Sequence, residues 1–67
     1  MSNKVFKRNV TILRKIMQTY LQQPTPEQIN VFEFDVQNIP KIAEKLYTYK
    51  QLEHIFLYSL YPVLKGE

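Results

Sequence analysis

The pattern of apolar and polar positions at the start of the chain is that of an amphipathic helix over residues 4–21. Its apolar stripe repeats every three or four residues and consists of Phe6, Val10, Leu13, Met17 and Tyr20, widened by Val5, Ile12, Ile16 and Leu21. At about 100° per residue these positions cover nearly half the circumference, which is typical of a helix that packs against at least two other elements. Pro24 and Pro26 end this helix, because a residue before proline avoids the helical region.

A second helix is predicted to begin at Pro26. Thr25 before it is suited to cap the helix, and Gln28 stands where a capping box needs its second side chain. Residues 29–37 are ambiguous, because their apolar residues also alternate with polar ones as in a strand. A lone strand would have no partner, so we predict a helix over residues 26–34 followed by an extended tail.

A third helical pattern covers residues 39–47. Its apolar face has the i, i+3, i+4, i+7 spacing of a helix and consists of Ile39, Ile42, Ala43 and Leu46. Asn38, directly before it, is a preferred N-cap residue. We therefore predict a short third helix here.

The last helix is predicted over residues 49–61. Thr48 and Gln51 repeat the capping-box arrangement, so a sharp corner leads directly into this helix. Its inner stripe is predicted to be Tyr49, Leu52, Ile55, Phe56, Ser59, Leu60 and Val63. Pro62 has no N–H to donate, so it should kink or end the helix and leave residues 64–67 to fray.

These elements predict an all-α fold, a compact orthogonal bundle of about four short helices in a single domain, 1–67. The predicted core consists of Phe6, Val10, Leu13, Met17, Phe32, Ile42, Leu46, Leu52, Ile55, Phe56 and Leu60. A chain of 67 residues is near the lower limit for a self-sufficient core, so self-association is a second route to stability.

The amino-acid composition disfavours a catalytic site and a metal site. The chain has no cysteine and one histidine, His54, so we expect no metal site and no cofactor. Neither Ser2 nor Ser59 has an obvious base, and Glu33 with Asp35 fits a pair of solvated carboxylates. We therefore expect a protein that is not an enzyme.

Charge is distributed unevenly along the chain. Residues 1–26 carry five cations and no anion, whereas residues 27–67 carry four cations and six anions, which gives +5 and −2. The five cations project from one side of the first helix and form the basic face: Lys4, Lys7, Arg8, Arg14 and Lys15. This face is either simply solvated or a landing surface for an acidic protein, nucleic acid or anionic lipid.

Residues 42–58 have some features of a helix-turn-helix that reads DNA. The turn position that favours glycine is Tyr47, however, and a position that should pack inside is Glu53. The second helix would present a single cation, Lys50, to the phosphates. Sequence-specific DNA binding is therefore disfavoured.

The last helix leaves a group of residues outside its inner stripe. This outer patch consists of His54, Leu57, Tyr58 and Tyr61. Tyrosine is a frequent anchor of protein interfaces because it offers a large area at little cost in entropy. The patch either packs beneath other parts of the chain or binds a partner protein, which includes a second copy in a homodimer.

Two segments carry a resemblance to a known family. Residues 10–21 and 39–64, with "IAEKL", "QLEHIF" and "YPVL" in that order, resemble a family of small helical bacterial proteins described only as a domain of unknown function. The resemblance implies a short helix joined to a longer helix that ends in a "PVL" tail. It implies no catalytic residue.

We expect a small non-catalytic protein-binding module of bacterial or phage origin. It would act as an inhibitor or toxin-immunity type protein that occludes a larger partner. The alternative is a nucleic-acid-binding accessory or regulatory protein that uses the basic face, and a third is attachment of the first helix to an anionic membrane. The chain has neither an apolar run long enough to span a bilayer nor a secretory signal, so a cytoplasmic location is the expectation.

Overall fold

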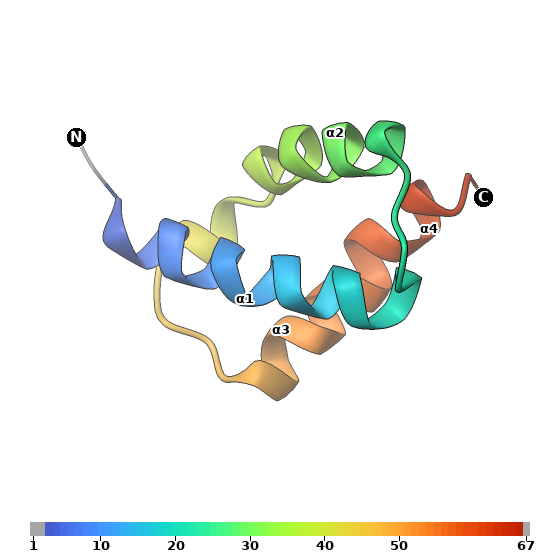
Figure 1. Ribbon diagram of the computed structural model, residues 1–67. Coiled ribbons are helices and arrows are strands. Elements are labelled where there is room, and N and C mark those ends of the chain that lie inside the picture. Colours follow the sequence, from blue (N-terminus) through green and yellow to red (C-terminus); the bar gives the residue numbers. More distant parts are fainter. Residues whose placement is uncertain (1–2, 67) are drawn as a thin grey trace.

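The computed structural model describes residues 3–66, so the expectations for Ser2 and Glu67 lie outside the described residues. Every regular element in this range is helical, which confirms the predicted fold class and excludes a strand within residues 29–37. In chain order the elements are α1 (Lys4–Leu21), α2 (Pro26–Asp35), the 3₁₀ turns η1 (Val36–Asn38) and η2 (Pro40–Ala43), α3 (Tyr49–Ile55), the π-helical η3 (Phe56–Leu60) and α4 (Tyr61–Leu64). In Figure 1, α1 crosses the centre of the molecule between α2 and α3.

Side-chain caps fix the starts of α2 and α3 as predicted, and a further cap starts α1. The Thr25 hydroxyl accepts from the Gln28 N–H at 3.1 Å, and the Gln28 side chain accepts from the Thr25 N–H at 2.9 Å. Thr48 and Gln51 form the same reciprocal pair at the start of α3. At α1 the N-cap is Asn3, which accepts from the Phe6 N–H at 2.9 Å. These caps satisfy backbone donors that have no partner within their own helix.

The end of α1 is a tight and strained turn. Gln22 adopts φ 62° and ψ −55°, a left-handed conformation that glycine accepts more easily than glutamine. The Gln23 N–H donates to the Leu21 carbonyl oxygen at 2.6 Å, which closes a three-residue γ-turn around Gln22. The turn reverses the chain toward α2.

The predicted helix over residues 39–47 is wrong. Only the 3₁₀ turn η2 forms there, and residues 44–48 have no regular structure. Asn38 belongs to η1 and does not cap η2, whose N-cap position is Ile39 without a side-chain hydrogen bond. The predicted extended tail after α2 is also absent, because η1 continues the helical path.

Side chains of α1 explain why residues 42–47 do not form a helix. The Asn9 Nδ2 donates to the carbonyl oxygens of Ile42 at 2.8 Å and Lys45 at 2.9 Å. The Arg8 Nη1 donates to the Tyr47 carbonyl oxygen at 2.7 Å. The Ile42 carbonyl, which a helix over residues 39–47 would pair with the Leu46 N–H, is thus bound to α1, so a tertiary contact competes with the local helical pattern.

The C-terminal helical run continues from Tyr49 to Leu64 without a break, through α3, η3 and α4. The described residues therefore form three helical rods rather than the predicted four helices, and their orthogonal arrangement stays a prediction. Within η3 the Tyr61 N–H donates to the Phe56 carbonyl, one residue further back than in an α-helix. Pro62 lies just after this wider turn and cannot donate to the Tyr58 carbonyl, which accounts for a distortion at this point.

Fewer residues of the last rod face the core than its predicted inner stripe contains. The buried positions recur every four residues as Leu52, Phe56, Leu60 and Leu64. Three members of the predicted inner stripe are instead exposed, namely Tyr49, Ser59 and Val63. Leu64 is buried and its carbonyl accepts from Gln28 Nε2 at 3.1 Å, so the predicted fraying does not begin there.

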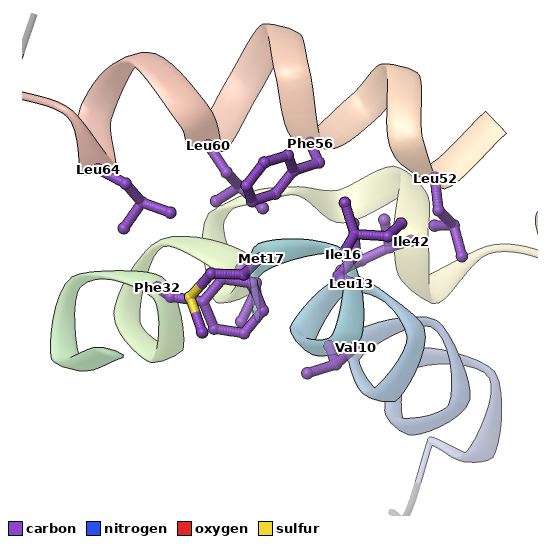
Figure 2. Packing of buried hydrophobic residues seen from close by; sticks show 11 residues of the cluster. Val10, Leu13, Ile16, Met17, Phe32, Ile42, Leu52, Phe56, Leu60 and Leu64 are labelled. Carbon is purple, nitrogen blue, oxygen red and sulfur yellow. The ribbon is translucent and has the colours of Figure 1, made fainter. Parts of the chain in front are cut away.

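One hydrophobic core joins all three rods, as Figure 2 shows. Eight predicted core residues are confirmed as buried: Val10, Leu13, Met17, Phe32, Ile42, Leu52, Phe56 and Leu60. Phe6 and Ile55 are partly buried at the edge of the core. The prediction that Leu46 belongs to the core is wrong, because Leu46 is 59 % exposed in the irregular segment after η2. The core also includes Ile16, Val36 and Leu64, which were not in the predicted set.

Candidate functional site

The basic face divides into three exposed lysines and two arginines that serve the fold. Lys4, Lys7 and Lys15 are exposed along the outside of α1. Arg8 is exposed too, but its guanidinium is bound to the Tyr47 carbonyl. This hydrogen bond orients the Arg8 guanidinium but leaves its positive charge on the surface.

Arg14 is the other arginine of the basic face, and it pairs with Glu33 of α2. Its Nε donates to Glu33 Oε2 at 2.9 Å and its Nη2 donates to Oε1 at 3.1 Å, a two-pronged pair. The hydrogen bonds to Glu33 raise the pKa of Arg14; partial burial opposes this, and the charge of Glu33 adds to it. The pair ties α1 to α2 and consumes one positive and one negative charge.

The outer patch is split by the fold. Tyr58 is 82 % exposed, and the ring of His54, also exposed, stacks on it with centroids 6.0 Å apart and planes 10° apart. Leu57 and Tyr61 are instead partly buried against the core. Only His54 and Tyr58 therefore form the open aromatic surface that the sequence predicts for all four residues.

Tyr61 belongs to an aromatic cluster with Tyr20 and Phe56. The centroids of Tyr20 and Tyr61 are 5.5 Å apart, and those of Phe56 and Tyr61 are 5.6 Å apart. The Tyr20 hydroxyl donates to Glu53 Oε2 at 2.6 Å. This hydrogen bond raises the pKa of Tyr20 above its ordinary value of 10.0, and partial burial and the charge of Glu53 act in the same direction.

His54 and Tyr58 stand on the wall of a groove between η2 and the last helical rod. This Tyr58 groove has a volume of about 340 Å³ and is lined by Ile39, Lys41, His54, Ile55, Tyr58 and Ser59. Ile39 and Ile55 supply the aliphatic part of the lining, and both are only partly buried against the core. Ile39 and Lys41 complete the lining from the side of η2.

A second hollow adjoins the Tyr58 groove and shares three residues with it. This Asp35 hollow has a volume of about 570 Å³. Its lining consists of Asp35, Asn38, Ile39, Pro40, Lys41, Glu44 and Ser59. Because Ile39, Lys41 and Ser59 border both spaces, the two adjoin as one depression, in which Asp35 and Glu44 line only the Asp35 hollow and Lys41 lines both.

Sequence reasoning missed Asn9, Ile39 and Lys41 as residues that build this site. Asn9 is fully buried, and its side chain binds the carbonyl oxygens of Ile42 and Lys45, just after Ile39 and Lys41 of the groove. A signal for it was present, since Asn9 is a polar residue in the middle of the apolar arc of α1, where a buried amide needs specific partners. Lys41 had no such signal, because its role depends on where η2 lies.

Comparisons with known proteins give no relative. No family model, no curated protein and no solved structure matches this chain. The resemblance of residues 10–21 and 39–64 to a family of unknown function therefore stays a prediction. The site has to be interpreted from its own geometry.

The polar groups that line the groove are Lys41, His54, Tyr58 and Ser59. Ser59 and His54 both line it, yet the hydrogen bonds found among residues 3–66 do not join them. Within the same residues no group of three or more His, Cys, Asp or Glu side chains is placed to hold a metal ion. No helix in the described part of the chain has the length and apolar character needed to cross a bilayer.

Proposed function

We propose that this protein is a small non-catalytic binding module and that the Tyr58 groove is its contact surface for another protein. The observation that carries this proposal is the position of Tyr58, whose ring is 82 % exposed at the rim of a groove lined by Ile39 and Ile55. A large exposed aromatic beside apolar surface is typical of residues that anchor protein interfaces.

The stack between His54 and Tyr58 supports the same proposal. A ring that is already held by a neighbour loses less conformational freedom when a partner covers it. Occlusion of a larger protein, as in an inhibitor or a toxin-immunity protein, is the form of binding that we propose. A homodimer through the same surface is the version in which the partner is a second copy.

Site-directed photocrosslinking tests the proposal. A photoreactive phenylalanine analogue replaces Tyr58 in one variant and Tyr49 in a matched control, and both are expressed in the source organism. Tyr49 is a suitable control because it is 50 % exposed at the start of α3, whereas Tyr58 lies in η3. We expect a discrete cross-linked protein from position 58 and none from position 49.

Binding to the captured protein then gives the quantitative test. Tyr58→Ser should weaken binding by about thirtyfold, the size of a typical anchor residue, while Tyr49→Ser should change it by less than about twofold. Tyr61 is unsuitable as a second substitution, because its contacts with Tyr20 and Phe56 stabilise the fold. Equal cross-linking at both positions, or equal effects of both serine variants, would contradict the proposal.

A second candidate function is nucleic-acid binding through the lysines of the basic face. It is favoured by the exposure of Lys4, Lys7 and Lys15 on one helix. The test is retention on heparin and binding to random duplex DNA at two salt concentrations, with Lys7→Glu and Lys15→Glu combined. Substitution of these two lysines leaves the hydrogen bonds of Arg8 and Arg14 in place. Strong, salt-sensitive binding that this variant loses would favour nucleic acid over protein.

Membrane attachment of α1 loses its physical basis. That mode needs the apolar face of the helix to be free for lipid. The structure buries this face in the core through Val10, Leu13, Ile16 and Met17. We therefore do not propose it.

A further inference from the structure

We infer that the Tyr58 groove binds a segment of a partner protein in which an aliphatic side chain stands next to an aspartate or glutamate. The inference rests on the proposed function, because it names the chemistry of what the groove would bind. Three features of the groove carry it: its apolar lining, the charge on its rim and the opposite charge of the hollow beside it.

The apolar lining favours an aliphatic side chain. Ile39 and Ile55 approach from opposite sides of the groove, one before η2 and the other at the end of α3. The stacked rings of His54 and Tyr58 add a flat apolar wall. A leucine-sized side chain placed here would remove water from both isoleucines and from the Tyr58 ring at once.

The polar groups of the Tyr58 groove favour a carboxylate beside that side chain. Lys41 is exposed on its rim, and among the described residues no carboxylate lies within ion-pair distance of its ammonium group. His54, Tyr58 and Ser59 can each donate a hydrogen bond, and none of the described residues that line this groove is acidic. A carboxylate is therefore the complementary charged group.

The Asp35 hollow determines which end of the depression takes the carboxylate. Asp35 and Glu44 line that hollow and would repel an acidic side chain. A carboxylate is thus directed to the part of the depression near His54, where Lys41 lines the Tyr58 groove. A segment with a lysine in place of the acid should avoid this end.

Three dipeptide probes test the charge preference directly. Acetyl-Leu-Asp N-methylamide carries the proposed pair, the Leu-Asn analogue has nearly the same shape without the charge, and the Leu-Lys analogue reverses it. Each is titrated into the ¹⁵N-labelled full chain and followed by amide chemical shifts up to about 20 mM, a range suited to ligands of this size. We expect shifts centred on Ile39, Lys41, Ile55 and Ser59, with the Asp probe binding about threefold more tightly than the Asn probe at low salt.

Lys41→Gln should abolish the difference between the Asp and Asn probes. Lys45→Gln is the matched control, since Lys45 is also exposed but lies over the Tyr47 ring and not in the groove. This control should keep the preference, and added salt should reduce it in the unsubstituted protein. These results together would support the inference.

Two outcomes would overturn the inference. One is the absence of shifts at the groove with every probe, and the other is a preference for the Asp probe that survives Lys41→Gln. Neither outcome touches the photocrosslinking result at position 58, which makes no assumption about charge. A captured partner without a charge preference would therefore refute this inference alone, whereas the absence of cross-linking at position 58 would refute the proposed function.

Discussion

The Asn9 side chain lies 2.8 Å from the carbonyl oxygen of Ile42, where its Nδ2 donates a hydrogen bond across 33 positions of the chain. Asn9 is fully buried, and every hydrogen-bonding group of its amide is used. Nδ2 also donates to Lys45, and Oδ1 accepts from Arg8 Nη1 at 3.0 Å and from the Tyr47 N–H at 3.4 Å. The Asn9 side chain of α1 thus fixes the path of residues 42–47, which follow Ile39 and Lys41 of the groove.

Asn9→Ala should lower the free energy of unfolding by about 2–4 kcal/mol, because it leaves buried backbone groups of residues 42–47 without partners. That is a large part of the total of about 3–10 kcal/mol expected for a domain of this size. Urea denaturation followed by circular dichroism measures the loss. Asn30→Ala is the control, since Asn30 is exposed within α2, and it should change stability by less than about 0.5 kcal/mol. Equal effects would show that the buried amide contributes no more than helix propensity.

Phe56→Ala should destabilise the fold by about 3–5 kcal/mol and leave much of the protein unfolded at room temperature. The Phe56 ring is fully buried and contacts Tyr20 and Tyr61, so its removal opens a cavity between α1 and the last rod. Phe34→Ala makes the same chemical change at a side chain that is 69 % exposed. Its free energy of unfolding, measured by urea denaturation, should stay within about 1 kcal/mol of that of the unsubstituted protein. A comparable loss in both variants would contradict the core described here.

The pair of Arg14 and Glu33 should contribute only about 0.5 kcal/mol despite its two hydrogen bonds. Their side chains are 41 % and 45 % exposed, so water and salt screen the attraction. A double-mutant cycle of Arg14→Met and Glu33→Gln measures the coupling. The coupling should fall further in 1 M salt, and a salt-independent value would indicate a far less solvated pair.

The hydrogen bond from Tyr20 to Glu53 predicts a pH dependence of stability on the alkaline side. Because folding raises the pKa of Tyr20 above 10.0, its contribution is present below pH 10 and is lost as the pH rises through the higher value of the folded state. Tyr20→Phe should therefore lose less stability than the unsubstituted protein between pH 7 and about pH 10.5. Urea midpoints at the two pH values test this. Tyr58→Phe should lose as much as the unsubstituted protein, and an equal loss in all three proteins would contradict the prediction.

Gln22→Gly should leave the stability unchanged or raise it by up to about 1 kcal/mol. Glycine removes the steric cost of φ 62° but adds freedom to the unfolded chain, and the two effects oppose each other. Gln23→Gly is the matched control, because Gln23 has no positive φ to relieve. It should lower stability by about 0.5–1 kcal/mol. Thermal unfolding of both variants measures the difference, and a greater loss at position 22 would contradict the strained turn.

The local features of this chain could be predicted from its sequence. The bounds of α1, the capping boxes at Thr25 and Thr48 and most of the core follow from side-chain periodicity and from hydrogen bonds that span three residues. Such signals are encoded within one or two helical turns. They require no knowledge of which other element lies nearby.

The tertiary structure decided where the groove lies and which charges are free. Residues 39–47 have a helical pattern, yet Asn9 and Arg8 of α1 bind their carbonyls, and this competition exists only once the two segments meet. In the last rod, Tyr61 packs against Tyr20 and Phe56 while Tyr58 stays exposed, which no local pattern distinguishes. The sequence by itself determined α1 and the starts of α2 and α3, because their signals come from neighbours along the chain. The candidate site depends on contacts between residues more than thirty positions apart, which no local pattern records.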